Sequence, residues 1–235
     1  MQRNPKLILF DIDGTLIYHV DASMQGFKRF AHAFALVYGV PITVDISTYN
    51  GMIDRQMAWK IAEPHGITRE VFLQKFPAYI TAMIEYLQEA AKKHPLYEAI
   101  PDALMLVKKL SAHKDITLGL ITGNAKRIAD WKLAHTGLST YFSFGLFGDE
   151  ADDRSALAKL VFAKARKELH QSFAGGDIVV IGDTVHDIRC GKAIGAVTIA
   201  VTTGLHGSRE PLEAEKPDFL VDSLMDNAVR DFLGV

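Results

Sequence analysis

The sequence contains a single cysteine, Cys190, among its 235 residues. One cysteine cannot form an internal disulfide, and we expect Cys190 to be a small buried side chain rather than a reactive thiol. A chain of this length buries enough apolar surface to fold without a disulfide or a structural metal. Any metal that the protein binds is therefore expected to serve chemistry.

Long apolar runs and an excess of one charge are also missing. The first apolar run, Leu7 to Phe10, ends at a carboxylate and is too short for the core of a secretion signal. No apolar stretch approaches the ~18 residues that span a bilayer. The formal net charge of -2 offers no polycationic face for nucleic acid. These absences predict a cytoplasmic enzyme, monomeric or homodimeric, with a small-molecule substrate and neither a membrane nor a nucleic-acid partner.

Short apolar runs alternate along the chain with segments of helical period. The runs are Leu7–Phe10, Thr117–Ile121, Ile178–Ile181 and Val197–Val201. The helical segments are Ala103–Leu110, Ala125–His135, Ala156–Leu169 and Asp187–Ile194. Unbroken apolar runs of this length are typical of strands that are covered on both faces. Their alternation with helices predicts an α/β fold in which helices wrap a parallel sheet.

The stretch from about residue 20 to residue 93 has helical patterns without a strand between them. The patterns are Met24–Tyr38, Gln56–Ala62, Arg69–Phe76 and Ala78–Ala91. Pro77 lies between the last two, and Asn50-Gly51 lies between the first two, so both positions suit helix ends or turns. We interpret the stretch as a helical insertion after the first strand, with its aromatic and methionine side chains forming a small core of its own.

Polar residues follow three of the four apolar runs, at the edge where an open parallel sheet binds ligands. The first group is Asp11-Ile12-Asp13-Gly14-Thr15. In an extended backbone Asp11 and Asp13 point to the same side, and two carboxylates this close repel each other unless a cation such as Mg²⁺ lies between them. An EF-hand counted from Asp11 fails, because Leu16 and Ala22 stand where Gly and Glu are needed. The alternative is a purely structural role, in which Asp13-Gly14 forms a turn and a helix cap.

The second and third groups follow later strands. Thr122-Gly123-Asn124 opens a helical segment, where backbone N–H groups and a hydroxyl can hold phosphate oxygens, although such residues also serve as N-caps. Asp183 ends a strand and Asp187 lies about one helical turn further, so both can serve a cation; helix capping is the alternative. His186 has no partner of metal-ligand type nearby in the sequence, and we interpret it as a bystander or a residue on the substrate side.

A phosphate approaching several carboxylates also needs a positive side chain. Arg154 is the first candidate, because a guanidinium can bind phosphate and carboxylate oxygens together, and Lys159 is the second. Either residue can instead be a solvated charge on a helix.

The combined pattern resembles the haloacid dehalogenase superfamily. The motifs match in order and are Ile8–Leu16, Leu120–Asn124, a basic residue, and Val180–Ile188. The resemblance implies a Rossmann-like, doubly wound parallel core at residues 1–17 and 98–235. It also implies an all-helical cap at residues 18–97, as in phosphoglycolate-phosphatase-like members. Many relatives carry Lys followed by Pro as the third motif; this chain lacks that pair, which leaves the choice between Arg154 and Lys159 open.

The resemblance also implies residue roles. Asp11 would be the nucleophile, and Asp13 would protonate the leaving oxygen and then deprotonate water. Asp11, Asp13 through its backbone carbonyl, Asp183 and Asp187 would hold Mg²⁺. The residues implied in phosphate binding are Thr122, Gly123, Asn124 and Arg154. The expected function is a magnesium-dependent phosphatase acting on a small phosphorylated metabolite through an aspartyl-phosphate.

Other reactions of the same fold remain as alternatives. A phosphomutase would keep every carboxylate, whereas the family's dehalogenases lack an acid at the position of Asp13. A non-catalytic binding module would be expected to have lost at least one carboxylate, and none is missing. Substrate choice would come from the cap, where the sequence has no readable code. Tyr18, His19, Asp21 and Arg55 are polar residues that could face the crevice, although solvation at the surface explains each of them equally well.

Overall fold

A six-stranded, wholly parallel sheet forms the centre of the computed structural model, which describes residues 7–20, 25–49, 51–204 and 208–235. The strand order is β5-β4-β1-β6-β7-β8. The strands are β1 (Leu7–Phe10), β4 (Thr117–Ile121), β5 (Phe144–Leu146), β6 (Ile178–Gly182), β7 (Val197–Val201) and β8 (Phe219–Val221). The four predicted strands are present, and β1 lies between β4 and β6, with Leu7 opposite both Thr117 and Ile178.

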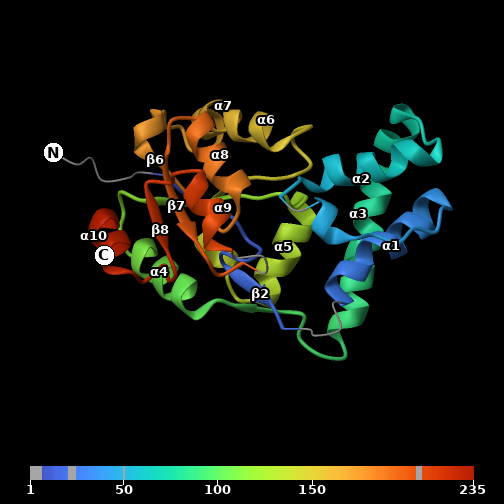
Figure 1. Ribbon diagram of the computed structural model, residues 1–235, viewed down its shortest axis with the longest axis horizontal. Helices are drawn as coiled ribbons and strands as arrows, with labels where there is room; N and C mark the ends of the chain where they lie inside the picture. The colour runs from blue at the N-terminus through green and yellow to red at the C-terminus, as the bar shows by residue number, and fades with distance from the viewer. Residues whose placement is uncertain (1–6, 21–24, 50, 205–207) are drawn as a thin grey trace.

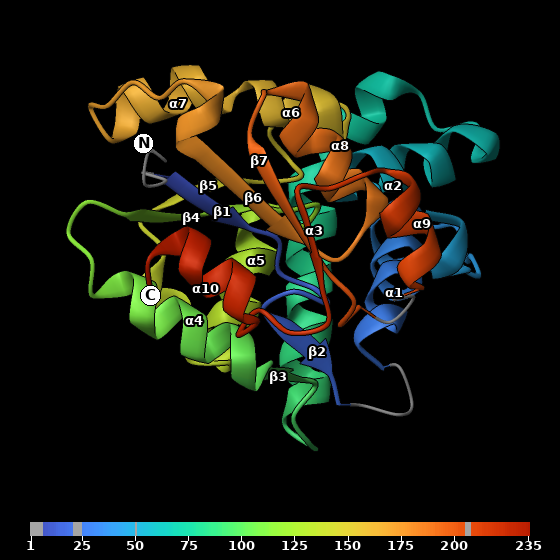
Figure 2. The ribbon, with the colours of Figure 1, turned by 60° about the vertical axis from the view of Figure 1, so that its left-hand side comes forward.

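Helices cover both faces of this sheet, so the predicted α/β, doubly wound class is confirmed (Figure 2). One face packs on α4 (Pro101–Ser111), α5 (Lys126–His135) and α10 (Asn227–Leu233); the other packs on α6 (Arg154–Lys159), α7 (Val161–Glu168) and α8 (Val185–Ala193). The alternation of β1 explains the two layers. Ile8 and Phe10 belong to the first core and Leu7 and Leu9 to the second, because successive strand side chains point to opposite faces.

One predicted helix of the core is divided in the structure, and the single cysteine lies in the core. The predicted helix Ala156–Leu169 is divided into α6 and α7 at Leu160. Cys190 is a free cysteine and is buried among the apolar side chains of the second core layer. The remaining helix of the core is α9 (Arg209–Ala214).

A small antiparallel ribbon joins the core to the inserted helices. Strand β2 (Ile17–His19) pairs with β3 (Tyr97–Ala99), and Tyr18 lies opposite Glu98. The chain thus leaves the core along β2 and returns along β3. The sequence does not predict these strands, but its proposed junctions, at residues 17–18 and 97–98, fall within them. The division into core and cap at those residues remains a proposal.

The cap is helical and lies beside the core (Figure 1). Its elements are α1 (Gln25–Tyr38), a 3-10 turn (Ile46–Tyr49), α2 (Asp54–Ala62), a second 3-10 turn (Glu63–His65) and α3 (Arg69–Ala91). Met24 and Asn50, which the sequence places at the start of a helix and at a turn, lie outside the described residues.

The break predicted at Pro77 is wrong, because Pro77 lies inside the continuous helix α3. Proline costs the helix one backbone hydrogen bond. Buried side chains on both sides of it, including Phe76 and Tyr79, belong to the same apolar core, so their burial holds the helix together. The Thr81 hydroxyl also donates to the Pro77 carbonyl at 3.0 Å.

No helix in the described part of the chain has both the length and the apolar character needed to cross a membrane.

Candidate functional site

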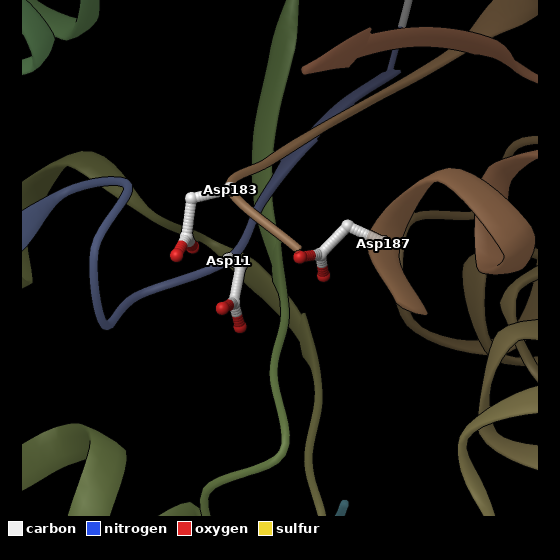
Figure 3. Close-up of side chains that lie close together, drawn as sticks. All are labelled: Asp11, Asp183 and Asp187. Carbon is white, nitrogen blue, oxygen red and sulfur yellow. The ribbon is translucent and has the colours of Figure 1, made fainter. Parts of the chain in front are cut away.

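Three carboxylates meet at the carboxyl edge of the sheet. Asp11 follows β1, Asp183 follows β6, and Asp187 lies in the first turn of α8. One carboxylate oxygen of each lies within 4.8 Å of the others, and Figure 3 shows the three groups close together. The pairing of Phe10 with Ile181 brings Asp11 beside Asp183. Asp187 is fixed by Thr184, whose backbone N–H and hydroxyl donate to Asp187 Oδ2 at 3.0 and 2.6 Å.

The carboxylates of this acidic cluster repel one another. Burial first, and the charge of Asp187 second, raise the pKa of Asp11 to about 7, and the nearby Arg154 only partly opposes them. Burial first, and then the charges of Asp187 and Asp11, raise the pKa of Asp183 well above its ordinary value. Asp11 Oδ1 is buried without a hydrogen bond. Several hard oxygen donors that repel one another fit a divalent cation of the Mg²⁺ type.

Arg154 is the basic side chain that reaches this cluster. It is buried, donates from Nη2 to Asp187 Oδ1, and places Nη2 3.3 Å from Asp11 Oδ1. Burial alone would lower the pKa of the guanidinium, but Asp187 and Asp11 raise it, so Arg154 stays charged. Lys159 lies at the far end of α6 and is exposed. The structure therefore brings Arg154 to the acidic cluster and leaves Lys159 at the surface.

The Asp13 carboxylate faces a different set of partners from Asp11. Lys132 Nζ lies 2.7 and 2.6 Å from its two oxygens, and Asn124 Nδ2 donates to Oδ2 at 2.7 Å. Desolvation would raise the pKa of Asp13, but the Lys132 charge and these hydrogen bonds lower it to about 2.

In the described residues the structure brings together three of the four acidic side chains named from the sequence, whereas the Asp13 carboxylate faces Lys132. The reason is local. The backbone N–H groups of Leu16 and Ile17 donate to the Ile12 carbonyl at 2.9 and 3.0 Å, so the chain turns directly after Asp11. The two-residue alternation of an extended strand does not continue to Asp13. The metal role that the resemblance implies for Asp13 uses its backbone carbonyl.

The Thr122–Asn124 segment lies at the end of β4. Thr122 is fully buried, and its Oγ1 accepts hydrogen bonds from the backbone N–H and the side-chain amide of Asn124 at 3.3 and 2.9 Å. Helix α5 begins after it, with Ala125 as N-cap, so neither Thr122 nor Asn124 is the cap of this helix. A Cβ on Gly123 would lie 2.7 Å from the Met52 carbonyl oxygen. Glycine therefore allows the cap to approach this loop.

The segment before α2 covers the site from the cap side. The Asp54 backbone N–H donates to the Gly123 carbonyl at 2.7 Å, and Asp54 Oδ2 accepts the Ala125 N–H at 2.7 Å. Arg154 Nη1 donates to the Gly51 carbonyl at 3.4 Å. The His186 ring packs against Gly51, where a Cβ would lie 2.7 Å from His186 Cγ. His186 is therefore a contact between core and cap.

The other polar residues suggested for the crevice have separate partners. Tyr18 donates to Glu98 at 2.7 Å at the surface, His19 stacks on Phe27 at 4.4 Å, and Asp21 lies outside the described residues. Arg55 forms an ion pair with Asp152 at 3.1 Å, which links cap and core.

The sequence analysis did not identify Lys132, Asp54 or Gly204, which contact Asp13, the start of α5 and Asp183, respectively. The position of Lys132 was readable, because it lies four residues after Ile128 on the buried face of α5, where an apolar residue is expected. Asp54 and Gly204 have no comparable pattern, because their partners Ala125 and Asp183 are distant in the sequence.

Comparisons of the sequence and of the structure with known proteins agree with one another. The profile of the family described as haloacid dehalogenase-like hydrolase matches residues 8–201. The chain is 26% identical to a phosphoglycolate phosphatase of Vibrio vulnificus strain YJ016, over 95% of this chain and 94% of that protein. It is 25% identical to the pyrophosphatase PpaX of Bacillus pumilus, with 93% of each covered. CbbY from Rhodobacter sphaeroides, solved with phosphate, has the same fold, with a TM-score of 0.71 and 18% identity over 97% of this chain and 99% of that one.

Proposed function

Because the chain belongs to the haloacid dehalogenase-like hydrolase family and its relatives are named as phosphatases, we propose that it is a magnesium-dependent phosphatase that works through an aspartyl-phosphate on Asp11. The observation that carries the proposal is the cluster of Asp11, Asp183 and Asp187, in which Asp11 and Asp187 are buried and Asp183 is partly buried, with Arg154 beside it. Buried carboxylates that raise one another's pKa are a costly arrangement unless function uses them. The negative carboxylates would bind a cation, and the positive Arg154 would bind a phosphoryl group.

Asp11, Asp183 and the backbone carbonyl of Asp13 are the groups that would hold the metal, with Asp187 in support. When bound, Mg²⁺ supplies positive charge that offsets the carboxylates and the phosphoryl oxygens. Arg154 supplies a second positive charge that is already fixed by Asp187. Thr122 and the backbone N–H groups around Gly123 and Asn124 would hold the remaining phosphoryl oxygens.

The covalent step would be carried by Asp11. Its carboxylate oxygen forms a bond to phosphorus while the ester P–O bond breaks, and the electron pair of that bond goes to the leaving oxygen. Asp13 gives the leaving oxygen a proton. Water then attacks the phosphorus of the aspartyl-phosphate, Asp13 takes a proton from it, and the Asp11 carboxylate is restored as inorganic phosphate leaves.

The ion pair with Lys132 has a consequence for this cycle. With its pKa near 2, Asp13 is ionised before substrate binds, which is the form that accepts a proton from water. A bound phosphate dianion would raise the pKa of Asp13 by repulsion, so the proton for the leaving oxygen would be taken up with the substrate.

The substrate would be a small phosphate monoester, because residues Gly51 to Asp54 contact both the loop after β4, at Gly123 and Ala125, and the Arg154 side chain. The names of the relatives set the first compounds to try, which are phosphoglycolate and pyrophosphate, followed by phosphorylated sugars and nucleotides.

Phosphate release by the purified protein tests the proposal. We expect release only with Mg²⁺ present and no turnover by Asp11→Asn, whereas Asp130→Asn, an exposed carboxylate on α5, should behave as the wild type. Acid quenching during turnover should leave a phosphoryl group on Asp11 that hydroxylamine removes. Turnover by Asp11→Asn would remove Asp11 from the nucleophile's role.

The same assay separates the alternatives. A phosphomutase would move the phosphoryl group within a sugar phosphate and release little inorganic phosphate. A dehalogenase would release halide from a haloacid without Mg²⁺. A binding module would release nothing from any compound tested.

A further inference from the structure

Lys132 is a charged side chain in the interior of the core. Its side chain is 1% exposed, and it lies on the face of α5 that packs toward the sheet. Burying an ammonium group is costly unless hydrogen-bond acceptors and an opposite charge surround it. A cation kept in such a position indicates a specific partner.

The partners of Lys132 use all three of its donors. Nζ lies 2.7 and 2.6 Å from the two oxygens of Asp13 and 2.8 Å from Asn124 Oδ1. Asn124 Nδ2 in turn donates to Asp13 Oδ2 at 2.7 Å and to Thr122 Oγ1 at 2.9 Å. These contacts form a closed network that joins Asp13 to the end of β4.

The network holds Asp13 from one side only. The Lys132 side chain is shielded from water, and its Nζ lies 5.0 Å from the centre of the Tyr97 ring. The Asp13 side chain is 39% exposed, so part of it remains accessible to solvent. Both carboxylate oxygens are contacted from the core, which fixes the plane of the carboxyl group as well as its position.

We propose that Lys132, together with Asn124, is a positioning residue that holds the Asp13 carboxyl group in the orientation needed to exchange a proton with the ester oxygen and with water. The inference rests on the proposed function, in which Asp13 is the acid and base. The Nζ contacts of Lys132 are to Asp13, Asn124 and the Tyr97 ring, so in this proposal its effect passes through Asp13.

A positioning role predicts a dependence on the leaving group. An alkyl phosphate needs a proton on its leaving oxygen, whereas 4-nitrophenyl phosphate has a leaving group that departs with little help. General acid catalysis contributes about 10²- to 10⁴-fold. Lys132→Met should therefore slow formation of the phosphoenzyme, measured in single turnovers by acid quench, about tenfold or more beyond its effect on the aryl ester. Asp13→Asn should show the same selective loss.

Two comparisons separate positioning from folding. Lys126→Met removes an exposed lysine of the same helix and should leave the ratio of the two rates at the wild-type value. The double variant Lys132→Met with Asp13→Asn removes both charges of the ion pair, so it should fold better than Lys132→Met alone and be no slower than Asp13→Asn. Lys132→Gln provides a neutral side chain that still forms hydrogen bonds. Its extra slowing on the alkyl phosphate, relative to the aryl ester, should be smaller than that of Lys132→Met.

Equal loss on both substrates, or losses that add in the double variant, would overturn the positioning role while the wild type still releases phosphate. A wild-type protein that releases phosphate from neither substrate would instead overturn the proposed function, and this inference with it. Thermal denaturation of each variant shows whether lost activity follows lost structure.

Discussion

Room for the Asp183 carboxylate comes from two glycines on separate loops. A Cβ on Gly14 would lie 2.7 Å from Asp183 Cγ, and a Cβ on Gly204 would lie 2.8 Å from the same atom. The Thr15 hydroxyl donates to Asp183 Oδ1 at 2.9 Å and fixes the group between them. These contacts restrict the position of the short Asp183 side chain. The glycines are thus part of the site although they contribute no ligand.

Gly204→Ala is expected to weaken Mg²⁺ binding. The added methyl group would collide with the Asp183 carboxylate and move it, and misplacing a group that supports a metal site costs about 10- to 100-fold in affinity. Titration calorimetry measures the change. Gly176→Ala is the matched control, because a Cβ there meets nothing within 4 Å and neither glycine has a positive φ. Equal affinities of the two variants would contradict this account of Gly204.

At the residue scale, the sequence predicts the groups that directly end a strand. Asp11, Thr122 and Asp183 each follow a long apolar run, so their meeting at one edge follows from the parallel sheet. The orientation of Asp13 could not be predicted, because it depends on the turn at Ile12. The place of Lys132 on the buried face of α5 was readable, but its partner was not, because Asp13 is 119 positions away in the sequence.

At the element scale, α2 of the cap begins against the start of α5 of the core. The α2 N-cap, Ile53, has no capping side chain, and the first-turn Asp54 instead accepts the N–H of Ala125, which is the N-cap of α5. The Asp54 backbone N–H donates to the carbonyl of Gly123, in the Thr122–Asn124 loop that we propose binds phosphate. One residue therefore connects the position of the cap to the position of that loop.

Asp54→Ala is expected to lower both stability and kcat/KM. It would leave the Ala125 N–H without its partner, which costs about 1–3 kcal/mol for a buried donor. Urea denaturation and steady-state kinetics measure the two effects. Glu70→Ala is the control, since Glu70 is the first-turn acid of α3 but is exposed, and its loss should change stability by less than about 0.5 kcal/mol. Asp54→Asn, which keeps a carbonyl oxygen, should lose less than Asp54→Ala.

The elements that the sequence predicts best are the long and strongly apolar ones. Strands β1, β4 and β7 have the predicted bounds, whereas β5 and β8 were missed because three-residue strands carry too short a pattern. The ribbon of β2 and β3 was missed for the same reason. Pro77 was misread because the rule for proline is local, while the burial that overrides it is tertiary.

At the scale of the whole molecule, the strand order explains why the site has a cover. The first strand is central in the sheet, and the ribbon through which the cap leaves and returns begins within seven residues of its end. The cap therefore lies next to the edge where Asp11 and Asp183 meet, beside the core in Figure 1. Because Asp11 and Asp183 come from distant segments, their carboxylates lie close together only when the chain is folded, so their mutual repulsion exists only in the folded protein.

That dependence predicts how pH and metal act on stability. The pKa of Asp11 is about 7 in the folded protein, against an ordinary value of 3.8, and the pKa of Asp183 is raised as well. Between these values the folded protein keeps protons that the unfolded chain has lost, so the free energy of unfolding falls as pH rises from about 4 to about 7. Asp13, with a pKa of about 2, acts in the opposite sense and only below about pH 4.

In the presence of a chelator, we therefore expect the melting temperature to fall between about pH 5 and about pH 8, by several degrees at about 2–4 °C per kcal/mol. Mg²⁺ binds the ionised carboxylates, so it should raise the melting temperature more at about pH 8 than at about pH 5. Scanning calorimetry at both pH values, with and without Mg²⁺, measures the difference. Asp11→Asn should flatten the dependence on pH, because the neutral amide removes the main titrating group and part of the repulsion on Asp183. An equal effect of Mg²⁺ at both pH values would mean that the cation binds elsewhere than at these buried carboxylates.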